Sequence, residues 1–194
     1  MHNLHKVFGN RVLNISSDHV FSGKSWWLPN DNTKSSPINS YGWSKVGAEA
    51  VSKVNGGKTI RLSRTVSMSD TDIKRVLRMQ LDTNVPTFFY RNYIHRQFAV
   101  DGIEYMANNW DGIKFDMVNY CGTENFSMYL FMTTLMDALG LNPDFIKARD
   151  EYFYDVPRPK RGGLKMSLAG KLGFPMYSMV DTINKLVEEY NAHS

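Results

Sequence analysis

The sequence holds a single cysteine, Cys121, so one chain cannot form an internal disulfide. Chains without disulfides are typical of reducing compartments, which predicts a cytoplasmic protein. No apolar run approaches the roughly 20 residues that a membrane-spanning helix requires, and residues 1–6 do not resemble a signal peptide. We therefore expect a soluble protein with no membrane partner. Cys121 itself follows an apolar segment, which favours a buried and unreactive thiol.

The sequence also lacks a dense block of basic residues. Lysine and arginine exceed aspartate and glutamate by only four charges over 194 residues, and they are dispersed along the chain. We therefore expect no nucleic-acid partner, although a slight basic excess suits a small ligand that carries phosphate. The five histidines show no metal-ligand spacing, so no metal site is predicted.

A third absence concerns glycine. None of the 14 glycines belongs to a G-x-x-G-x-x-G loop. Such a loop makes a tight turn and offers backbone N–H groups and a helix N-terminus to the pyrophosphate of a dinucleotide. The sequence as it stands therefore provides no such cradle.

Short apolar runs alternate with amphipathic stretches, which is typical of an α/β fold with parallel pairing. Residues 145–156 are expected to be irregular. The expected strands are residues 11–15, 59–62, 87–90 and 113–120. The expected helices are residues 1–9, 40–54, 71–81, 100–108 and 127–139, with a last helix that begins after the capping residue Ser178.

Tyr41 and Lys45 are one helical turn apart and therefore share a face of the helix expected over residues 40–54. A tyrosine hydroxyl is a poor base at neutral pH, but a nearby ammonium favours its ionised form. The phenol can then exchange a proton with a carbonyl or alcohol oxygen. A hydroxyl at the end of the upstream strand, such as that of Ser17, can donate to the same oxygen. The pair alone is weak evidence, because chance places a surface tyrosine beside a lysine in many proteins.

Two longer segments surround this pair. Segment 15–23, with the sequence ISSDHVFSG, is similar to the strand and turn "STDYVFDG" of extended short-chain dehydrogenases/reductases. Segment 37–49, PINSYGWSKVGAE, is similar to the "P-x-N-x-Y-G-x-S-K-x-x-x-E" of the same family. Weaker matches follow in the family's order over residues 60–64, 97–102, 158–159 and 171–174. The chain most resembles the dTDP-4-dehydrorhamnose reductase branch of this NAD-dependent epimerase/dehydratase superfamily.

The resemblance implies the C-terminal half of a Rossmann-like parallel sheet together with a small α/β substrate-binding domain. Residues 1–70 would form the partial Rossmann-like region that carries the tyrosine and lysine. Residues 71–194 would form mainly the substrate-binding region, interleaved with the remaining sheet strands. The strand expected over residues 11–15 would then have an unpaired outer edge.

The resemblance also implies roles for individual residues. Tyr41 would be the acid/base, Lys45 would assist it and bind the cofactor ribose beside Ser16, and Ser17 would polarise a sugar carbonyl. The implied substrate-binding residues are Asp18, His19, Arg158 and Arg96, of which the arginines suit a diphosphate. The family has tyrosine at the position of His19.

The implied activity is reduction of the 4-keto group of a deoxysugar nucleotide with NADP or NAD as hydride carrier. Epimerases and dehydratases share the tyrosine–lysine pair, so the reaction type stays open. The implied partners are a nucleotide-sugar substrate and either a separately encoded N-terminal half or a second copy of the chain. A reduced homologue, which binds a nucleotide sugar as a regulatory module without turnover, is the alternative.

Overall fold

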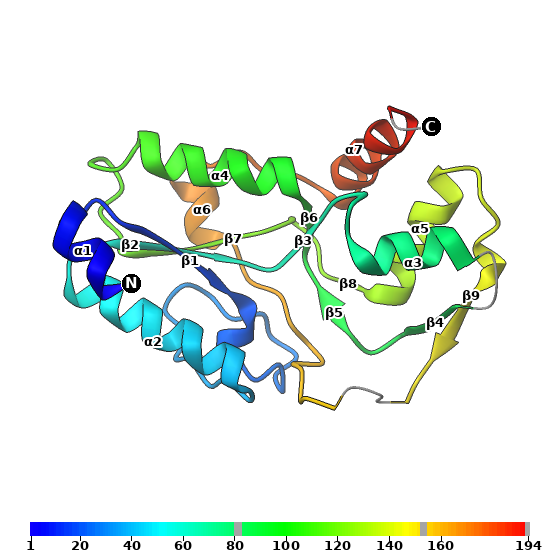
Figure 1. Cartoon of the computed structure of the whole chain (residues 1–194), viewed down its shortest axis with the longest axis horizontal. Coiled ribbons are helices and arrows are strands. Elements are labelled where there is room, and N and C mark those ends of the chain that lie inside the picture. The colour runs from blue at the N-terminus through cyan, green and yellow to red at the C-terminus, as the bar shows by residue number, and fades with distance from the viewer. Residues whose placement is uncertain (80–82, 152–154, 193–194) are drawn as a thin grey trace.

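The computed structural model describes residues 1–79, 83–151 and 155–192. Its centre is a three-stranded parallel sheet in the order β1-β2-β7. In Figure 1 this sheet runs along the chain's long axis, with α2 on one side and α4 and α6 on the other. The predicted α/β fold with parallel strands is confirmed. The bounds of these elements are β1 Leu13–Ser17, β2 Lys58–Leu62, β7 Met117–Tyr120, α2 Ser40–Val54, α4 Arg96–Asn108 and α6 Ser167–Lys171.

The remaining elements gather mostly at the other end of the molecule (Figure 1). Three pairs of short strands lie there or at the junction with the sheet: β3–β6 and β4–β9 are parallel, and β5–β8 is antiparallel. Their bounds are β3 Arg64–Val66, β4 Thr83–Pro86, β5 Tyr90–Arg91, β6 Tyr93–His95, β8 Phe126–Ser127 and β9 Ile146–Arg149. The other helices are α1 His2–Phe8, α3 Thr71–Met79, α5 Met128–Ala138 and α7 Met179–Asn191, with 3₁₀ turns at Asp18–Val20 and Pro143–Phe145.

Each of these two halves has its own group of buried apolar residues. The first group packs the sheet against α4 and α6, and the second packs α3, α5 and α7 against the short strands. In the first group, α4 approaches β7 closely at Gly102. A Cβ at this position would clash with the ring of Tyr120. Glycine is therefore required at this point of α4 for the helix to approach β7. In the described residues, no helix is both long and apolar enough to cross a membrane.

The predicted helix caps at Ser127 and Ser178 are confirmed. Ser127 accepts a hydrogen bond from the backbone N–H of Leu130, and Ser178 forms a capping box with Asp181, as predicted. Gly9 and Gly140 follow helices with positive φ, in agreement with the predicted helix ends. Each of these signals depends on residues within a few positions of one another, which explains why the sequence reveals them.

Several predicted elements were wrong or displaced. The strand predicted over 87–90 is wrong except at Tyr90, because β4 ends at Pro86 and β5 begins at Tyr90. The stretch predicted to be irregular contains β9, which pairs with β4. Helix α4 begins at Arg96, four residues earlier than predicted, and β1 lies two residues later than predicted. The predicted helix 71–81 is observed as far as Met79, and residues 80–82 lie outside the described part.

Candidate active site

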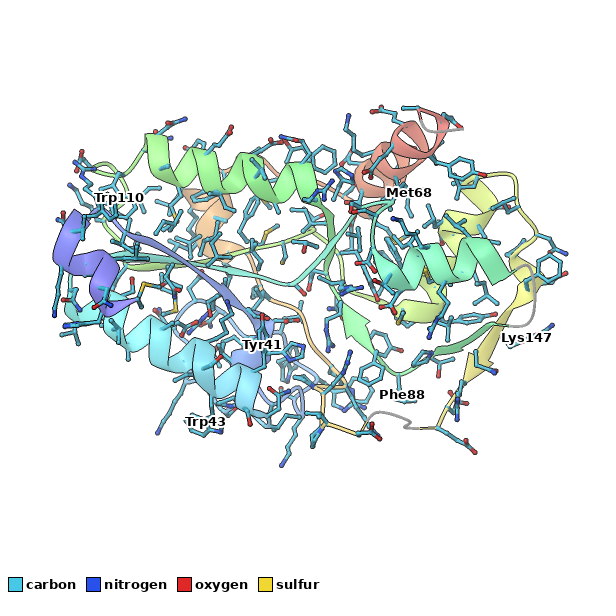
Figure 2. All side chains as sticks on the ribbon, in the orientation of Figure 1. Tyr41, Trp43, Met68, Phe88, Trp110 and Lys147 are labelled. Carbon is cyan, nitrogen blue, oxygen red and sulfur yellow. The ribbon has the colours of Figure 1, made fainter. Side chains whose placement is uncertain are left out.

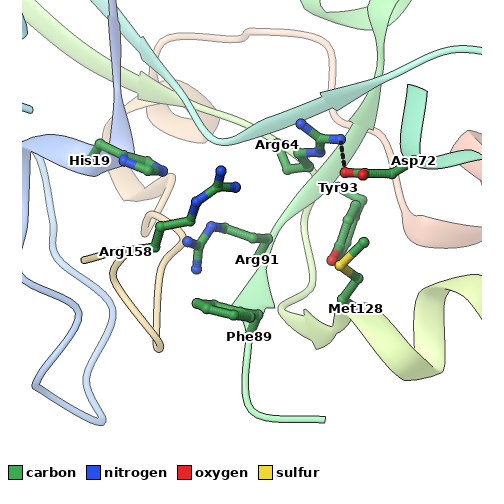
Figure 3. A pocket seen from close by; sticks show the side chains of 8 residues that line it. All are labelled: His19, Arg64, Asp72, Phe89, Arg91, Tyr93, Met128 and Arg158. Carbon is green, nitrogen blue, oxygen red and sulfur yellow. Dashed lines mark hydrogen bonds and ion pairs between the residues drawn. The ribbon is translucent and has the colours of Figure 1, made fainter. Parts of the chain in front are cut away.

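The candidate site lies where β1 and β2 end, at the junction between the sheet and the second group of elements. Parallel α/β sheets bind ligands beyond the carboxyl ends of their strands. A cleft with a volume of about 90 Å³ opens at this place (Figure 3). It is lined by His19, Arg64, Asp72, Phe89, Arg91, Tyr93, Met128 and Arg158.

Tyr41 stands beside this cleft because α2 begins there. Asn39 caps the helix by accepting a hydrogen bond from the N–H of Gly42 at 2.8 Å, which fixes the first turn that carries Tyr41. The Tyr41 side chain is 51% exposed, and its ring meets His19 edge to face with centroids 5.4 Å apart. Figure 2 shows Tyr41 near the middle of the molecule, whereas Trp43 points away from α2. The Tyr41 ring therefore lies next to His19, which lines the cleft.

Lys45 lies one turn further along α2, as the spacing predicted. Its ammonium is 5.6 Å from the centroid of the Tyr41 ring, so the two side chains share one face of the helix. The same ammonium donates a hydrogen bond to the backbone carbonyl of Ile15 at 2.9 Å. The amine is therefore held between the tyrosine and the strand β1.

Ser17 and Asp18 end strand β1 and belong to one hydrogen-bond network. The Ser17 hydroxyl donates to Asp18 at 3.2 Å and accepts from the backbone N–H of His19. Asp18 is only 3% exposed, and its second oxygen accepts hydrogen bonds from Ser63 and from the N–H of Gly163, both at 3.0 Å. This buried carboxylate ties three distant segments together, so it can orient the cleft without itself facing a ligand.

The Asp18 carboxylate also positions a cation of the cleft. Arg91 lies 3.4 Å from Asp18 and donates to the carbonyls of Tyr90 and Pro159 at 2.6 and 2.7 Å. Arg64 is held in a similar way by Asp70 and by Asp72 at the far side of the cleft. The lining therefore presents three guanidinium groups, which can donate hydrogen bonds to an anionic ligand, while Asp18, Asp70 and Asp72 balance part of their charge.

His19 lies beside these arginines, and its surroundings favour the neutral imidazole. Burial lowers the pKa of its imidazole below 6.5, and the positive charges of Arg91 and Arg158 lower it further, against the opposing effect of Asp18. Its Nδ1 atom lies 3.4 Å from the side-chain nitrogen of Asn39. The neutral ring can exchange hydrogen bonds with a ligand in the cleft without adding charge.

The other two predicted residues lie away from the cleft. The buried Ser16 hydroxyl donates to Glu49 of α2 at 2.6 Å, so it is directed into the protein. Arg96, at the start of α4, lies 3.8 Å from Glu189 of α7. The structure thus brings Ser17, Asp18, His19, Tyr41, Lys45 and Arg158 to one region, whereas Ser16 and Arg96 face other partners.

Six of the cleft residues were not predicted from the sequence: Arg64, Asp72, Phe89, Arg91, Tyr93 and Met128. Arg64 had a usable signal, because it directly follows the strand β2 at the end where parallel sheets bind ligands. Phe89, Arg91 and Tyr93 lie on or beside short strands whose pairing depends on distant residues, and no local pattern marks them. Asp72 and Met128 lie at the starts of α3 and α5. Within the described residues, no group of three or more histidine, cysteine, aspartate or glutamate side chains is arranged to hold a metal ion.

Solved structures show the same fold. The chain superposes on dTDP-4-dehydrorhamnose reductase from Clostridium acetobutylicum with a TM-score of 0.82 and 16% identity, over 99% of this chain and 69% of that one. The corresponding reductase from Bacillus anthracis, in complex with NADP, gives a TM-score of 0.80 and 17% identity, over 94% of this chain and 65% of that one. A UDP-galactose 4-epimerase gives a TM-score of 0.73 and 16% identity, over 99% and 67%.

The predicted resemblance to dTDP-4-dehydrorhamnose reductases and related NAD-dependent epimerases and dehydratases is therefore confirmed at the level of the fold. The chain spans about two thirds of the length of these structures. No family model matches the sequence, and no curated protein matches it by sequence.

Proposed function

Because this fold is that of nucleotide-sugar reductases, epimerases and dehydratases, we propose that the chain is a reductase-like protein acting on a nucleotide sugar. The substrate would be a nucleotide-activated deoxysugar with a 4-keto group. The observation that carries the proposal is the half-exposed Tyr41 phenol beside a cleft lined by three arginines. The guanidinium donors of the cleft suit the diphosphate, and the phenol suits proton transfer to the sugar oxygen.

In this proposal Tyr41 gives a proton to the oxygen of the sugar carbonyl. The Lys45 ammonium favours the ionised phenol that remains after the transfer. Ser17 donates a hydrogen bond to the same oxygen as negative charge develops there. Asp18 orients Arg91, while His19 and Arg158 contact the substrate from the lining of the cleft. Arg96 is the weakest of the proposed substrate contacts, because it lies on α4 beside Glu189.

A nicotinamide cofactor, NADP or NAD, would supply the hydride when bound. The described residues do not by themselves fit this group. The sequence has no glycine-rich loop, and Ser16, proposed to help Lys45 bind the cofactor, is engaged with Glu49. The chemistry assigned to this chain is therefore substrate binding and proton transfer. Without a partner, this chain should bind NADPH weakly. Micromolar affinity in a titration would overturn that expectation.

The proposal includes a partner for the cofactor site. A separately encoded N-terminal half or a second copy of the chain would complete it, in the cytoplasm and without a membrane or nucleic acid. Within the chain, residues 1–70 form the region with the tyrosine–lysine pair, and residues 71–194 form mainly the substrate-binding region. Strand β7 fits the interleaving, because it comes from the second region and pairs with β2 of the first.

A second candidate function is a nucleotide-sugar-binding or regulatory module without turnover. Two observations favour it: the Lys45 ammonium is bonded to a backbone carbonyl, and the Ser16 hydroxyl is buried. Both functions predict that a nucleotide sugar binds in the cleft. They differ only in whether the tyrosine hydroxyl is needed for a reaction.

The test compares Tyr41→Phe with the wild type and with Tyr129→Phe, a matched change on α5. NADPH oxidation is followed with dTDP-4-dehydro-6-deoxyglucose at high cofactor concentration. We expect Tyr41→Phe to lower the rate at least about 100-fold, as for loss of a general acid, and Tyr129→Phe to leave it unchanged. Equal turnover in all three proteins refutes the catalytic role of Tyr41. Sugar binding without turnover in any of them, although a titration shows that NADPH is bound at the concentration used, favours the second candidate.

A further inference from the structure

The side-chain amide of Asn39 makes three contacts at the edge of the cleft, and two of them fix its orientation. One end accepts a hydrogen bond from the backbone N–H of Gly42 at 2.8 Å, so this end must be the oxygen. The other end lies 2.8 Å from the backbone carbonyl of Pro157, which is an acceptor, so this end must be the NH₂ group. Two backbone groups therefore decide which way the amide faces.

The third contact of the amide is with His19. The nitrogen of the NH₂ group lies 3.4 Å from Nδ1 of the imidazole. An NH₂ group of this kind donates and does not accept, so a lone pair and not a proton must face it from Nδ1. A neutral imidazole carries one proton, which is then on Nε2. Asn39 thus selects one of the two neutral forms of the histidine.

The backbone holds these two side chains next to each other. Gly42, in the first turn of α2, lies against the carbonyl of His19, and a Cβ at this glycine would clash with that carbonyl. The N–H of His19 donates to the Ser17 hydroxyl at 3.2 Å, which fixes the start of the 3₁₀ turn that carries the ring. The approach of Asn39 to the imidazole therefore follows from close packing of α2 on this turn.

The opposite nitrogen of the ring, Nε2, is available to a ligand. Within the described residues, the imidazole forms its hydrogen bond through Nδ1 and not through Nε2. Figure 3 shows the ring of His19 reaching toward Arg158 in the cleft. The charged groups that act on the ring are Asp18, Arg64, Arg91 and Arg158. Burial and the three guanidinium groups lower the pKa of the imidazole against the opposing effect of the aspartate, so the ring is neutral at pH 7.

We propose that Asn39 is a positioning residue that holds His19 as a neutral donor with its proton on Nε2, and that this N–H donates to an oxygen of the sugar in the bound nucleotide sugar. The ligand part of this inference rests on the proposed function. The guanidinium groups beside the ring suit the phosphates. The ring itself meets Tyr41 edge to face with centroids 5.4 Å apart, which assigns its N–H to the sugar end of the ligand.

One amide would then serve both groups that face the sugar. Its oxygen caps the helix that carries Tyr41, and its NH₂ group sets the proton of His19. The same NH₂ group donates to Pro157, the residue before Arg158, so the segment with this arginine is tied to the same point.

The test is nitrogen NMR of the imidazole in the full chain, without ligand and at a pH well above 6.5. A protonated and an unprotonated ring nitrogen give well-separated signals, and the signals of His19 are identified by their loss in His19→Gln. We expect Nε2 to carry the proton in the wild type. A proton on Nδ1 overturns the proposal.

Two variants of Asn39 separate its effect on the ring from its role as a helix cap. Asn39→Asp keeps the cap, because aspartate is an equally good N-cap residue, but it places a carboxylate beside Nδ1 in place of a donor. The proton should then move to Nδ1, and the pH at which His19 titrates should rise. Asn39→Ser also keeps a cap and removes the amide without adding charge. Its share of the Nδ1–H form should increase by up to about tenfold, the net value of one hydrogen bond.

The matched control is Asn142→Asp. Asn142 also accepts a backbone hydrogen bond as a cap, at the 3₁₀ turn Pro143–Phe145, and it does not line the cleft. The variant adds the same charge as Asn39→Asp and should leave the proton and the titration of His19 unchanged. Equal behaviour of His19 in Asn39→Asp and Asn142→Asp overturns the proposal, and so does an unchanged share of the two forms in Asn39→Ser.

The ligand part is tested by adding dTDP-glucose to the wild type, with calorimetry on the same sample to show binding. The Nε2 signal of His19 should shift, and its proton should exchange with water more slowly. The same experiment with dTDP, which lacks the sugar, should leave that proton unchanged. Bound dTDP-glucose with an unchanged Nε2–H, or an equal effect of dTDP, overturns the donation to the sugar. The proton position is measured without ligand, so a failure of the proposed function, seen as absence of binding, is distinguishable from a failure of this inference.

Discussion

The buried ion pair between Glu49 and Arg61 should be a main determinant of the site's stability, because it joins α2 to the sheet. Both residues are almost fully buried, at 5% and 3% exposed. The Glu49 carboxylate accepts two hydrogen bonds from Arg61, both at 2.8 Å, and one from Ser16 at 2.6 Å. Helix α2 carries Tyr41 and Lys45, so this contact fixes their helix against β1 and β2.

Removing one partner leaves the other charge buried without compensation. The cost of such a change is about 3–5 kcal/mol. We therefore expect Glu49→Leu and Arg61→Met each to lower the free energy of unfolding by that amount. The double variant removes both charges and leaves apolar side chains of similar size, so it should lose less than either single variant, with the unpaired Ser16 hydroxyl as its remaining cost. The coupling between the two positions should be correspondingly large.

The assay is urea unfolding at neutral pH, followed by far-ultraviolet circular dichroism, for the wild type and all three variants. Glu188→Leu is the control, because Glu188 pairs with Lys185 at 2.7 Å on the surface, and its midpoint should stay close to that of the wild type. Losses below about 1 kcal/mol in both single variants would refute the reasoning, since a buried charge cannot lose its partner at so small a cost. A double variant as unstable as the single ones would contradict it as well.

Three further predictions concern single residues. Cys121 is completely buried, and burial raises the pKa of its thiol. A thiol reagent should therefore modify it only after unfolding, and fast labelling of the native protein would contradict this prediction. Burial lowers the pKa of His19 below 6.5, so around that pH the unfolded chain binds more protons than the folded one, and the free energy of unfolding should rise with increasing pH. His19→Gln should flatten this rise, and an unchanged slope would contradict the prediction. Ser178→Ala removes the capping box of α7 and should cost about 0.5–2 kcal/mol in urea unfolding, whereas no loss would show that the cap contributes little.

The elements that could be predicted from the sequence are those with local causes. The cap at Ser127 and the helix stop at Gly140 depend on a few neighbouring residues, and the structure has both. Strand β9 could not be found, because its backbone is paired with β4, which lies more than fifty positions earlier in the chain. Short strands of this kind are stabilised by pairing and burial, which local propensity does not report.

The same distinction applies to the candidate site. The neighbouring positions of Tyr41 and Lys45 follow from helical geometry alone, so spacing was sufficient to predict them. The guanidinium of Arg91 is held at the cleft by Asp18 and by the carbonyl of Pro159, which belong to distant segments. The burial of Ser16 against Glu49 likewise depends on how α2 packs on β1, which the sequence pattern does not show.

The central claim is that the arginine-lined cleft beside Tyr41 binds a nucleotide sugar. Its most direct test is titration calorimetry with dTDP-glucose and UDP-galactose on the wild type, Arg158→Ala and the distant surface variant Lys147→Ala. We predict saturable binding of at least one ligand, weakened about tenfold or more by Arg158→Ala, as for loss of a charged contact, and unaffected by Lys147→Ala. Absence of binding of both ligands to the wild type, or equal affinities in all three proteins, would contradict the account.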